Sequence, residues 1–127
     1  MSEQAFNEVV VLDCSEGISG AYCTKLLADF GATVIKIEKP GIGDTSRRME
    51  PFLNDEPNPE KSGTFFYLNT NKKSITLNLE SESGKNIFLK LLKKADIVVE
   101  NFAPGEMSKL GLSYAALVKI KPQIIMT

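Results

Sequence analysis

Apolar and polar residues alternate along the first part of the chain in two rhythms, which predict a strand, a helix and a second strand. Residues 9–12 form a continuous apolar run typical of a strand buried on both faces. Residues 18–30 follow a helical period, and Gly31 can end this helix because glycine tolerates positive φ. A second strand is predicted over residues 33–38, and the short turns indicate a βαβ unit with parallel strands. The predicted buried stripe of the helix comprises Ala21, Tyr22, Leu26, Leu27 and Phe30.

The same alternation of periods resumes at residue 74. Residues 74–79 alternate apolar and polar as a half-buried strand does. Ser81 is a suitable N-cap for the helix that follows, which ends near Lys93 and Lys94. Its predicted apolar stripe comprises Ile87, Phe88, Leu91, Leu92 and Ala95.

The last third of the chain repeats the pattern in shorter pieces. Residues 96–101 read as a buried strand, and Pro104 is placed where a helix can begin, since the first helical position needs no N–H donor. A short helix over 114–121 and a final strand over 124–127 follow. Regular alternation of strands and helices predicts an α/β fold, with a Rossmann-like open, mainly parallel sheet and flanking helices.

The middle segment, residues 39–73, shows no sustained period and is predicted to be a long loop. It contains four prolines, and loops of this length in compact domains are usually functional or disordered. The aromatic residues Phe65, Phe66 and Tyr67 and the pair Arg47 and Arg48 favour a loop that docks on another surface.

Composition excludes several classes of function. A length of 127 residues with 43% hydrophobic content suits one domain, and a net charge of −1 offers no electrostatic footprint for nucleic acid or an anionic membrane. No apolar run approaches a membrane span, and residues 1–8 lack the features of a signal peptide, so a soluble, cytoplasmic protein is expected. Cys14 and Cys23 are expected to be reduced, with Cys23 in or near the core. The chain has no histidine, and neither a catalytic residue nor a metal ligand is assigned.

Ligands of open α/β sheets bind beyond the carboxyl ends of the strands, which places residues 14–20, 39–48 and 101–109 at the candidate site. Gly17 and Gly20 either let the backbone approach a ligand or only permit a tight turn, and GlyIleSerGly at 17–20 is not a dinucleotide fingerprint. Four basic residues either pair with phosphates or remain solvated: Lys39, Arg47, Arg48 and Lys109. Asn101 and Phe102 either hold a heterocycle by hydrogen bond and stacking or form a turn beside a buried ring.

Four blocks resemble a known family. They are VLDCSEGISGAYCTKLLADFGATVIKIEKPGIGD at 11–44, NTNKKSITLNL at 69–79, ADIVVENFAPG at 95–105 and KLGL at 109–112. In order and spacing they resemble the N-terminal domain of the family III CoA-transferases, the carnitine and formyl-CoA transferase group, over residues 9–127. The resemblance implies that residues 1–127 are a fragment, the N-terminal part of a large CoA-binding Rossmann-like domain.

The resemblance also implies an activity. Family members transfer CoA from an acyl-CoA to a carboxylic acid through an aspartyl-CoA intermediate, and the catalytic aspartate would lie after this chain, which alone would be inactive. Coenzyme A would be a substrate, no cofactor would be covalently bound, and the full-length protein would be a homodimer. Two alternatives stay open: an acyl-CoA racemase of the same fold, and a non-catalytic α/β nucleotide-binding module.

Residues that match the family's CoA contacts lie in several separate segments. Lys39 and Lys109 stand where arginine is frequent, and a lysine loses the bidentate fork. Glu80 stands where lysine is frequent, and formyl-CoA transferase-like members carry glutamine at the position of Ile18. The implied CoA-binding residues are Ile18, Ser19, Lys39, Leu77, Asn78, Leu79, Glu80, Asn101, Phe102, Ala103 and Lys109.

Overall fold

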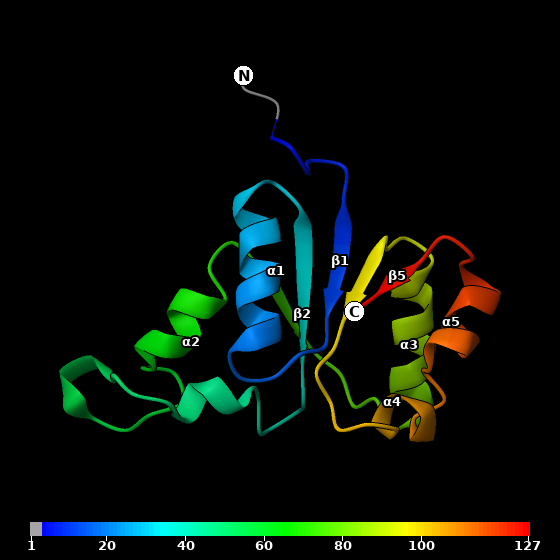
Figure 1. Cartoon of the computed structure of the whole chain (residues 1–127). Coiled ribbons are helices and arrows are strands. Elements are labelled where there is room, and N and C mark those ends of the chain that lie inside the picture. Colours follow the sequence, from blue (N-terminus) through cyan, green and yellow to red (C-terminus); the bar gives the residue numbers. More distant parts are fainter. Residues whose placement is uncertain (1–3) are drawn as a thin grey trace.

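A computed structural model describes residues 4–127 as a five-stranded sheet flanked by helices (Figure 1). Residues 1–3 lie outside the described residues. They belong to the predicted domain, 1–127, and to residues 1–8, which are predicted to lack a signal peptide. Every strand pair is parallel, and the order is β3-β2-β1-β4-β5. The predicted α/β class with an open parallel sheet is therefore confirmed. The strands are β1 (Val10–Asp13), β2 (Thr33–Glu38), β3 (Lys73–Thr76), β4 (Ile97–Val99) and β5 (Ile125–Met126).

The helices form a layer on each side of the sheet (Figure 1). One side carries α1 (Ser19–Asp29) and α2 (Gly63–Leu68), and the other carries α3 (Glu82–Leu92) and α5 (Tyr114–Ile120), with the short α4 (Glu106–Lys109) near the carboxyl ends of the strands. The strand order reverses at β1, which lies between β2 and β4, so the loops after β1 and β4 lead to opposite faces and leave a crevice between them. Among residues 4–127, no helix is long and apolar enough to span a bilayer.

Successive strand residues point to opposite faces and build two cores. Leu12 and Val98 face α3, where Phe88 and Leu92 are buried in the larger core. Val11, Val34 and Val99 pack with Ala28 and Ala32 on the α1 side in a smaller core. This two-sided burial explains why β1 reads as a continuous apolar run.

Helix α1 ends as predicted but faces the sheet differently. Gly31 follows it with φ +105°, which confirms the predicted helix end. The predicted stripe is wrong in part, because Tyr22, Leu26 and Phe30 are exposed at 44%, 41% and 58%, and Cys23 is exposed too. The reason is close packing: a Cβ on Gly20 would lie 2.3 Å from the Cβ of Ser15. Only small side chains fit there, so the buried residues are Gly20, Ala21, Thr24 and Ala28.

The segment predicted as a long loop contains regular structure. It holds two 3-10 turns, η1 (Thr45–Arg48) and η2 (Leu53–Asp55), before α2 carries the predicted aromatic cluster. The buried Ser62 organises the segment: its hydroxyl caps α2 by accepting from Phe65 N at 3.1 Å and donates to the carbonyl oxygens of Ser46 and Met49 at 2.8 and 2.6 Å. Hydrogen bonds of single polar residues hold this segment in place, which is why the hydrophobic pattern of the sequence does not predict its turns and helix.

The remaining predicted elements are found with shifted ends. Ser81 caps α3 as predicted, since its hydroxyl accepts from Gly84 N at 3.0 Å, but Ile87 of the predicted stripe is 45% exposed. The helix predicted to begin at Pro104 begins at Glu106, because Gly105 adopts φ +87° and occupies the N-cap. The strand predicted over 74–79 is the shorter β3. The helix predicted over 114–121 ends one residue early, and the strand predicted over 124–127 is one residue shorter at each end.

Candidate active-site cleft

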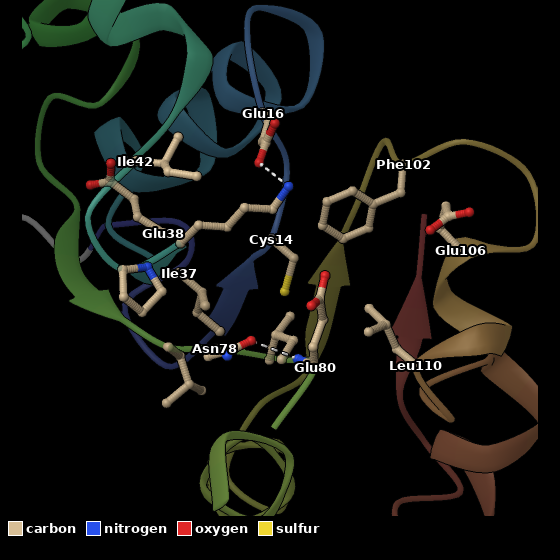
Figure 2. Close-up of a pocket in the computed structure, with 14 residues that line it drawn as sticks. Cys14, Glu16, Ile37, Glu38, Ile42, Asn78, Glu80, Phe102, Glu106 and Leu110 are labelled. Atoms are coloured by element: carbon tan, nitrogen blue, oxygen red, sulfur yellow. Dashed lines mark hydrogen bonds and ion pairs between the residues drawn. The ribbon is translucent and has the colours of Figure 1, made fainter. Parts of the chain in front are cut away.

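A cavity of about 420 Å³ opens at the carboxyl ends of β1 to β4, where the strand order reverses. Figure 2 shows Cys14 at its centre, Ile42 and Glu38 on one side, Phe102, Glu106 and Leu110 on the other, and Asn78 and Glu80 along the third. Each wall comes from the segment that follows a strand, so the parallel sheet itself brings these distant residues together.

Six of the predicted CoA-binding residues line this cavity: Lys39, Leu77, Asn78, Leu79, Glu80 and Phe102. The other five lie outside its lining. Ile18 and Ser19 are exposed at the beginning of α1, Lys109 is exposed on α4, and Asn101 turns its amide toward the backbone of Glu16. Ala103 instead lines a second cavity of about 350 Å³, between α4 and the end of β5. The predicted site thus follows one rim of the sheet, with its centre at the first cavity.

The lining of the first cavity is acidic, which is unusual for a site that binds phosphate. It contains four glutamates and a single lysine, Lys39. Three of the carboxylates have a basic partner: Glu16 Oε1 lies 3.2 Å from Lys39 Nζ, Glu106 pairs with Lys109, and Glu38 pairs with Arg47. Glu80 forms no ion pair with any residue in 4–127. A phosphate entering the cavity would therefore meet Lys39 as its nearest cation and Glu80 as a repulsive neighbour.

Arg47, one of the basic residues considered for phosphate binding, is occupied within the protein. Its guanidinium donates to both oxygens of Glu38 at 2.7 and 2.9 Å and stacks on the Phe65 ring, 3.7 Å from the ring centroid. Burial alone would raise the pKa of Glu38, but hydrogen bonds from Arg47, Asp44 N and Ser74 hold it below its usual range. Arg47 therefore fastens the segment after β2 to the sheet.

The turn between β1 and α1 is held by side chains from other elements. Asn101, after β4, accepts from Glu16 N at 2.8 Å and donates to Glu16 O at 2.7 Å. Lys36 on β2 donates to Ser15 O at 2.8 Å, and Asp44 accepts from Gly17 N at 3.1 Å. Three consecutive turn residues thus have backbone groups bound by three distant side chains.

Behind this turn lies a buried charge cluster, comprising Asp13, Lys36, Asp44 and Lys72, that sequence reasoning missed. Lys36 Nζ lies 2.6 Å from Asp44 Oδ2 and 3.9 Å from Asp13 Oδ2. Within residues 4–127, the Lys36 ion pair is the one direct polar contact of Asp44 Oδ2. Lys72 Nζ donates to Asp13 Oδ2 at 2.9 Å and to Ala21 O at 2.8 Å. The signal that could have revealed it is Lys36 itself, a lysine between Val34, Ile35 and Ile37 in the middle of β2.

The cluster balances two carboxylates against two ammonium groups. Burial alone would raise the pKa of Asp44, but the ion pair with Lys36 and the hydrogen bonds from Ser46 hold it below its usual range. Burial lowers the pKa of Lys72, and the charge of Asp13 opposes this shift. Because the four charges are paired with one another, the cluster holds the turn and the sheet together. None of the four groups is left free to transfer a proton.

Cys14 supplies no nucleophile to the cavity. It is almost completely buried, and burial, reinforced by the charge of Asp13, raises the pKa of its thiol, so the sulfur stays protonated near neutral pH. What the cavity offers is apolar contact from Ile37, Leu77 and Leu79, an aromatic face from Phe102, and hydrogen-bonding groups at its rim. This arrangement can bind and orient an elongated, partly polar ligand.

Comparison with known proteins identifies relatives over nearly the whole chain. Residues 6–127 match the family described as CoA-transferase family III. The chain is 42% identical over 120 residues to acetyl-CoA:oxalate CoA-transferase of Acetobacter aceti, covering 94% of this chain and 30% of that protein. It is 46% identical over 122 residues to formyl-CoA:oxalate CoA-transferase of Afipia carboxidovorans, covering 96% and 28%. The chain therefore spans about a third or less of the length of these relatives.

Solved structures agree in fold. A CAIB/BAIF family protein from Brucella suis superimposes with a TM-score of 0.87 at 32% identity, over 98% of this chain and 33% of that one. The hypothetical protein Rv3272 of Mycobacterium tuberculosis gives a TM-score of 0.84 at 36% identity, over 97% and 32%.

Proposed function

Because the chain belongs to CoA-transferase family III, we propose that it is the CoA-binding part of an enzyme that moves CoA from an acyl-CoA to a carboxylic acid. In this proposal residues 1–127 are the N-terminal part of the larger domain. The cavity at the carboxyl ends of the strands would hold CoA, and transfer would proceed through an aspartyl-CoA intermediate on an aspartate beyond Thr127. A homodimer in the cytoplasm would be the working form.

The observation that carries this proposal is the cavity at the reversal of strand order. Four separate segments of the family-matching sequence converge there, and Lys39, Glu80 and Phe102 face it from three walls. Phe102 can stack on a purine, residues 77–80 can present backbone groups to it, and Lys39 stands at the rim where a phosphate would lie. The Cys14 thiol that lines the cavity stays protonated near neutral pH, so the proposal gives this cavity a role in binding and assigns the transfer step to the aspartate.

Titration with CoA tests the proposal. We expect a Kd of roughly micromolar to millimolar, because each ion pair between an exposed lysine and a phosphate of CoA contributes about 1 kcal/mol at most to the binding free energy. Binding should weaken at high salt, since the contacts to phosphate are screened. Calorimetry and chemical-shift perturbation at two salt concentrations measure both effects.

Variants locate the site. Phe102→Ala and Lys39→Ala should each weaken binding, whereas Lys90→Ala, which removes an exposed lysine on α3, should leave it unchanged. If CoA does not bind, or if its shifts map away from Leu77, Glu80 and Phe102, the proposed function is wrong for this cavity.

A further inference from the structure

The geometry points to Asn101 as a positioning residue that clamps the turn between β1 and α1. This inference rests on the proposed function, since the clamp acts on a turn at the rim of the proposed CoA cavity. The family resemblance implies that Asn101 contacts CoA. In the structure its amide is already engaged by Glu16, with its oxygen accepting at 2.8 Å and its nitrogen donating at 2.7 Å.

The two bonds close a ring between one side-chain amide and the backbone of one residue. At position 101, an ionised aspartate could only accept from Glu16 N–H and a lysine could only donate to Glu16 O. The asparagine amide has an acceptor and a donor side by side and does both. Asn101 and Glu16 are 85 positions apart in the sequence, so the clamp ties the segment after β4 to the segment after β1 across the crevice. These are the two segments that diverge at the reversal of strand order.

Asn101 is one of three side chains that bind the backbone of the turn between β1 and α1. Lys36 holds Ser15 O from the sheet, and Asp44 holds Gly17 N from the segment after β2. Lys36 and Asp44 are almost completely buried, whereas Asn101 is exposed. Asn101 can therefore be changed without leaving a buried charge unpaired, which separates its effect from that of the charge cluster.

Clamping Glu16 has two consequences for the cavity. The side chain of Glu16 lines it and pairs with Lys39, so a fixed backbone at Glu16 also places the cation proposed to meet a phosphate. Ile18 and Ser19 follow two residues later and begin α1, so the same clamp sets where these exposed residues stand at the rim. Asn101 thus acts through Glu16 on binding.

Backbone hydrogen exchange and CoA titration of the Asn101→Ala chain test the assignment together. We expect the Glu16 amide to exchange about tenfold faster, while the amides of Leu12 and Val98 in the sheet keep their protection. CoA should bind about three- to tenfold more weakly. Asn86→Ala, which removes an exposed asparagine from α3, is the matched control and should change neither quantity.

A second variant separates the two bonds. Asn101→Asp keeps an acceptor for Glu16 N–H but loses the donor to Glu16 O, so the Glu16 amide should stay protected. CoA affinity should fall at low salt, where the added negative charge also repels the phosphates. If Asn101→Ala weakens CoA binding with Glu16 exchange unchanged, the amide contacts CoA directly and the clamp is wrong. If the unchanged chain binds no CoA, the proposed function fails, and the exchange rate of Glu16 still decides whether Asn101 holds the turn.

Discussion

Glu80 is the residue that makes the cavity least suited to a phosphate. Its carboxylate lines the cavity and, within residues 4–127, has no basic partner. Glu80→Lys replaces a repulsion by an attraction, so we expect CoA to bind about 3- to 10-fold more tightly at low salt. Glu8→Lys makes the same change of net charge near the opposite end of β1 and should have little effect. An equal gain in both variants would show that net charge alone sets the affinity.

Lys36 is the residue on which the buried charge cluster depends. Lys36→Met removes the ammonium group that pairs directly with the buried Asp44, so we expect the free energy of unfolding in urea to fall by about 3–5 kcal/mol. The double variant Lys36→Met, Asp44→Asn removes both charges and should recover part of this loss. Lys90→Met on the exposed side of α3 should stay within about 0.5 kcal/mol of the unchanged chain. A double variant as unstable as the sum of its single variants would contradict the ion pair.

At the scale of the elements, α3 is pressed against the turn that follows β3. A Cβ on Gly84 would lie 1.9 Å from the carbonyl oxygen of Asn78, a contact that requires backbone movement. Alanine normally favours a helix interior over glycine by about 1 kcal/mol. Here we expect Gly84→Ala to lower the free energy of unfolding by about 1–3 kcal/mol instead.

The same variant should reach the site, because Asn78 lines the cavity. Moving its backbone should weaken CoA binding in the part of the population that stays folded. Ser83→Ala, at the exposed neighbouring position, is the control and should leave both stability and binding nearly unchanged. A Gly84→Ala chain more stable than the original would show that the turn yields without cost.

Elements with a clear period could be predicted from the sequence, and elements fixed by single contacts could not. The strands, α1, α3 and their ends at Gly31 and Ser81 follow from apolar spacing and capping chemistry. The part of the α1 stripe that was predicted wrongly depends on how closely Gly20 approaches Ser15, a distance that no periodicity encodes. The turns of the 39–73 segment depend on Ser62 and Asp44, whose hydrogen-bond partners are known only in three dimensions.

The location of the candidate site could be predicted from the sequence, but the contacts within it could not. Its location followed from the rule that ligands bind beyond the carboxyl ends of parallel strands, and six of the predicted residues do line one cavity. Their contacts with CoA stay a prediction. The partners of Asn101 and Arg47 could not be predicted, because both side chains bind groups brought close only by the fold.

At the scale of the whole molecule, the rotated face of α1 leaves several of its apolar residues exposed. The α1/α2 surface is defined by Tyr22 and Leu26 of α1, Phe30 directly after α1, and Phe66 and Tyr67 of α2, each at least 41% exposed. The two helices are joined there, since Lys25 Nζ lies 5.2 Å from the Tyr67 ring centroid and Asn71 donates to Asp29 at 2.8 Å. Single exposed apolar residues are ordinary, but five on or directly after two helices that contact one another are candidates for a contact surface.

We therefore expect the chain to self-associate through the α1/α2 surface, with an apparent mass in light scattering that rises with concentration. Leu26→Glu with Phe66→Glu places two charges in that contact and should restore a concentration-independent monomer mass. Ile87→Glu changes an exposed apolar residue on α3, at the other side of the sheet, and should leave the association as it was. A monomer mass for the unchanged chain at every concentration, or equal dissociation by Ile87→Glu, would mean that the surface does not carry the contact.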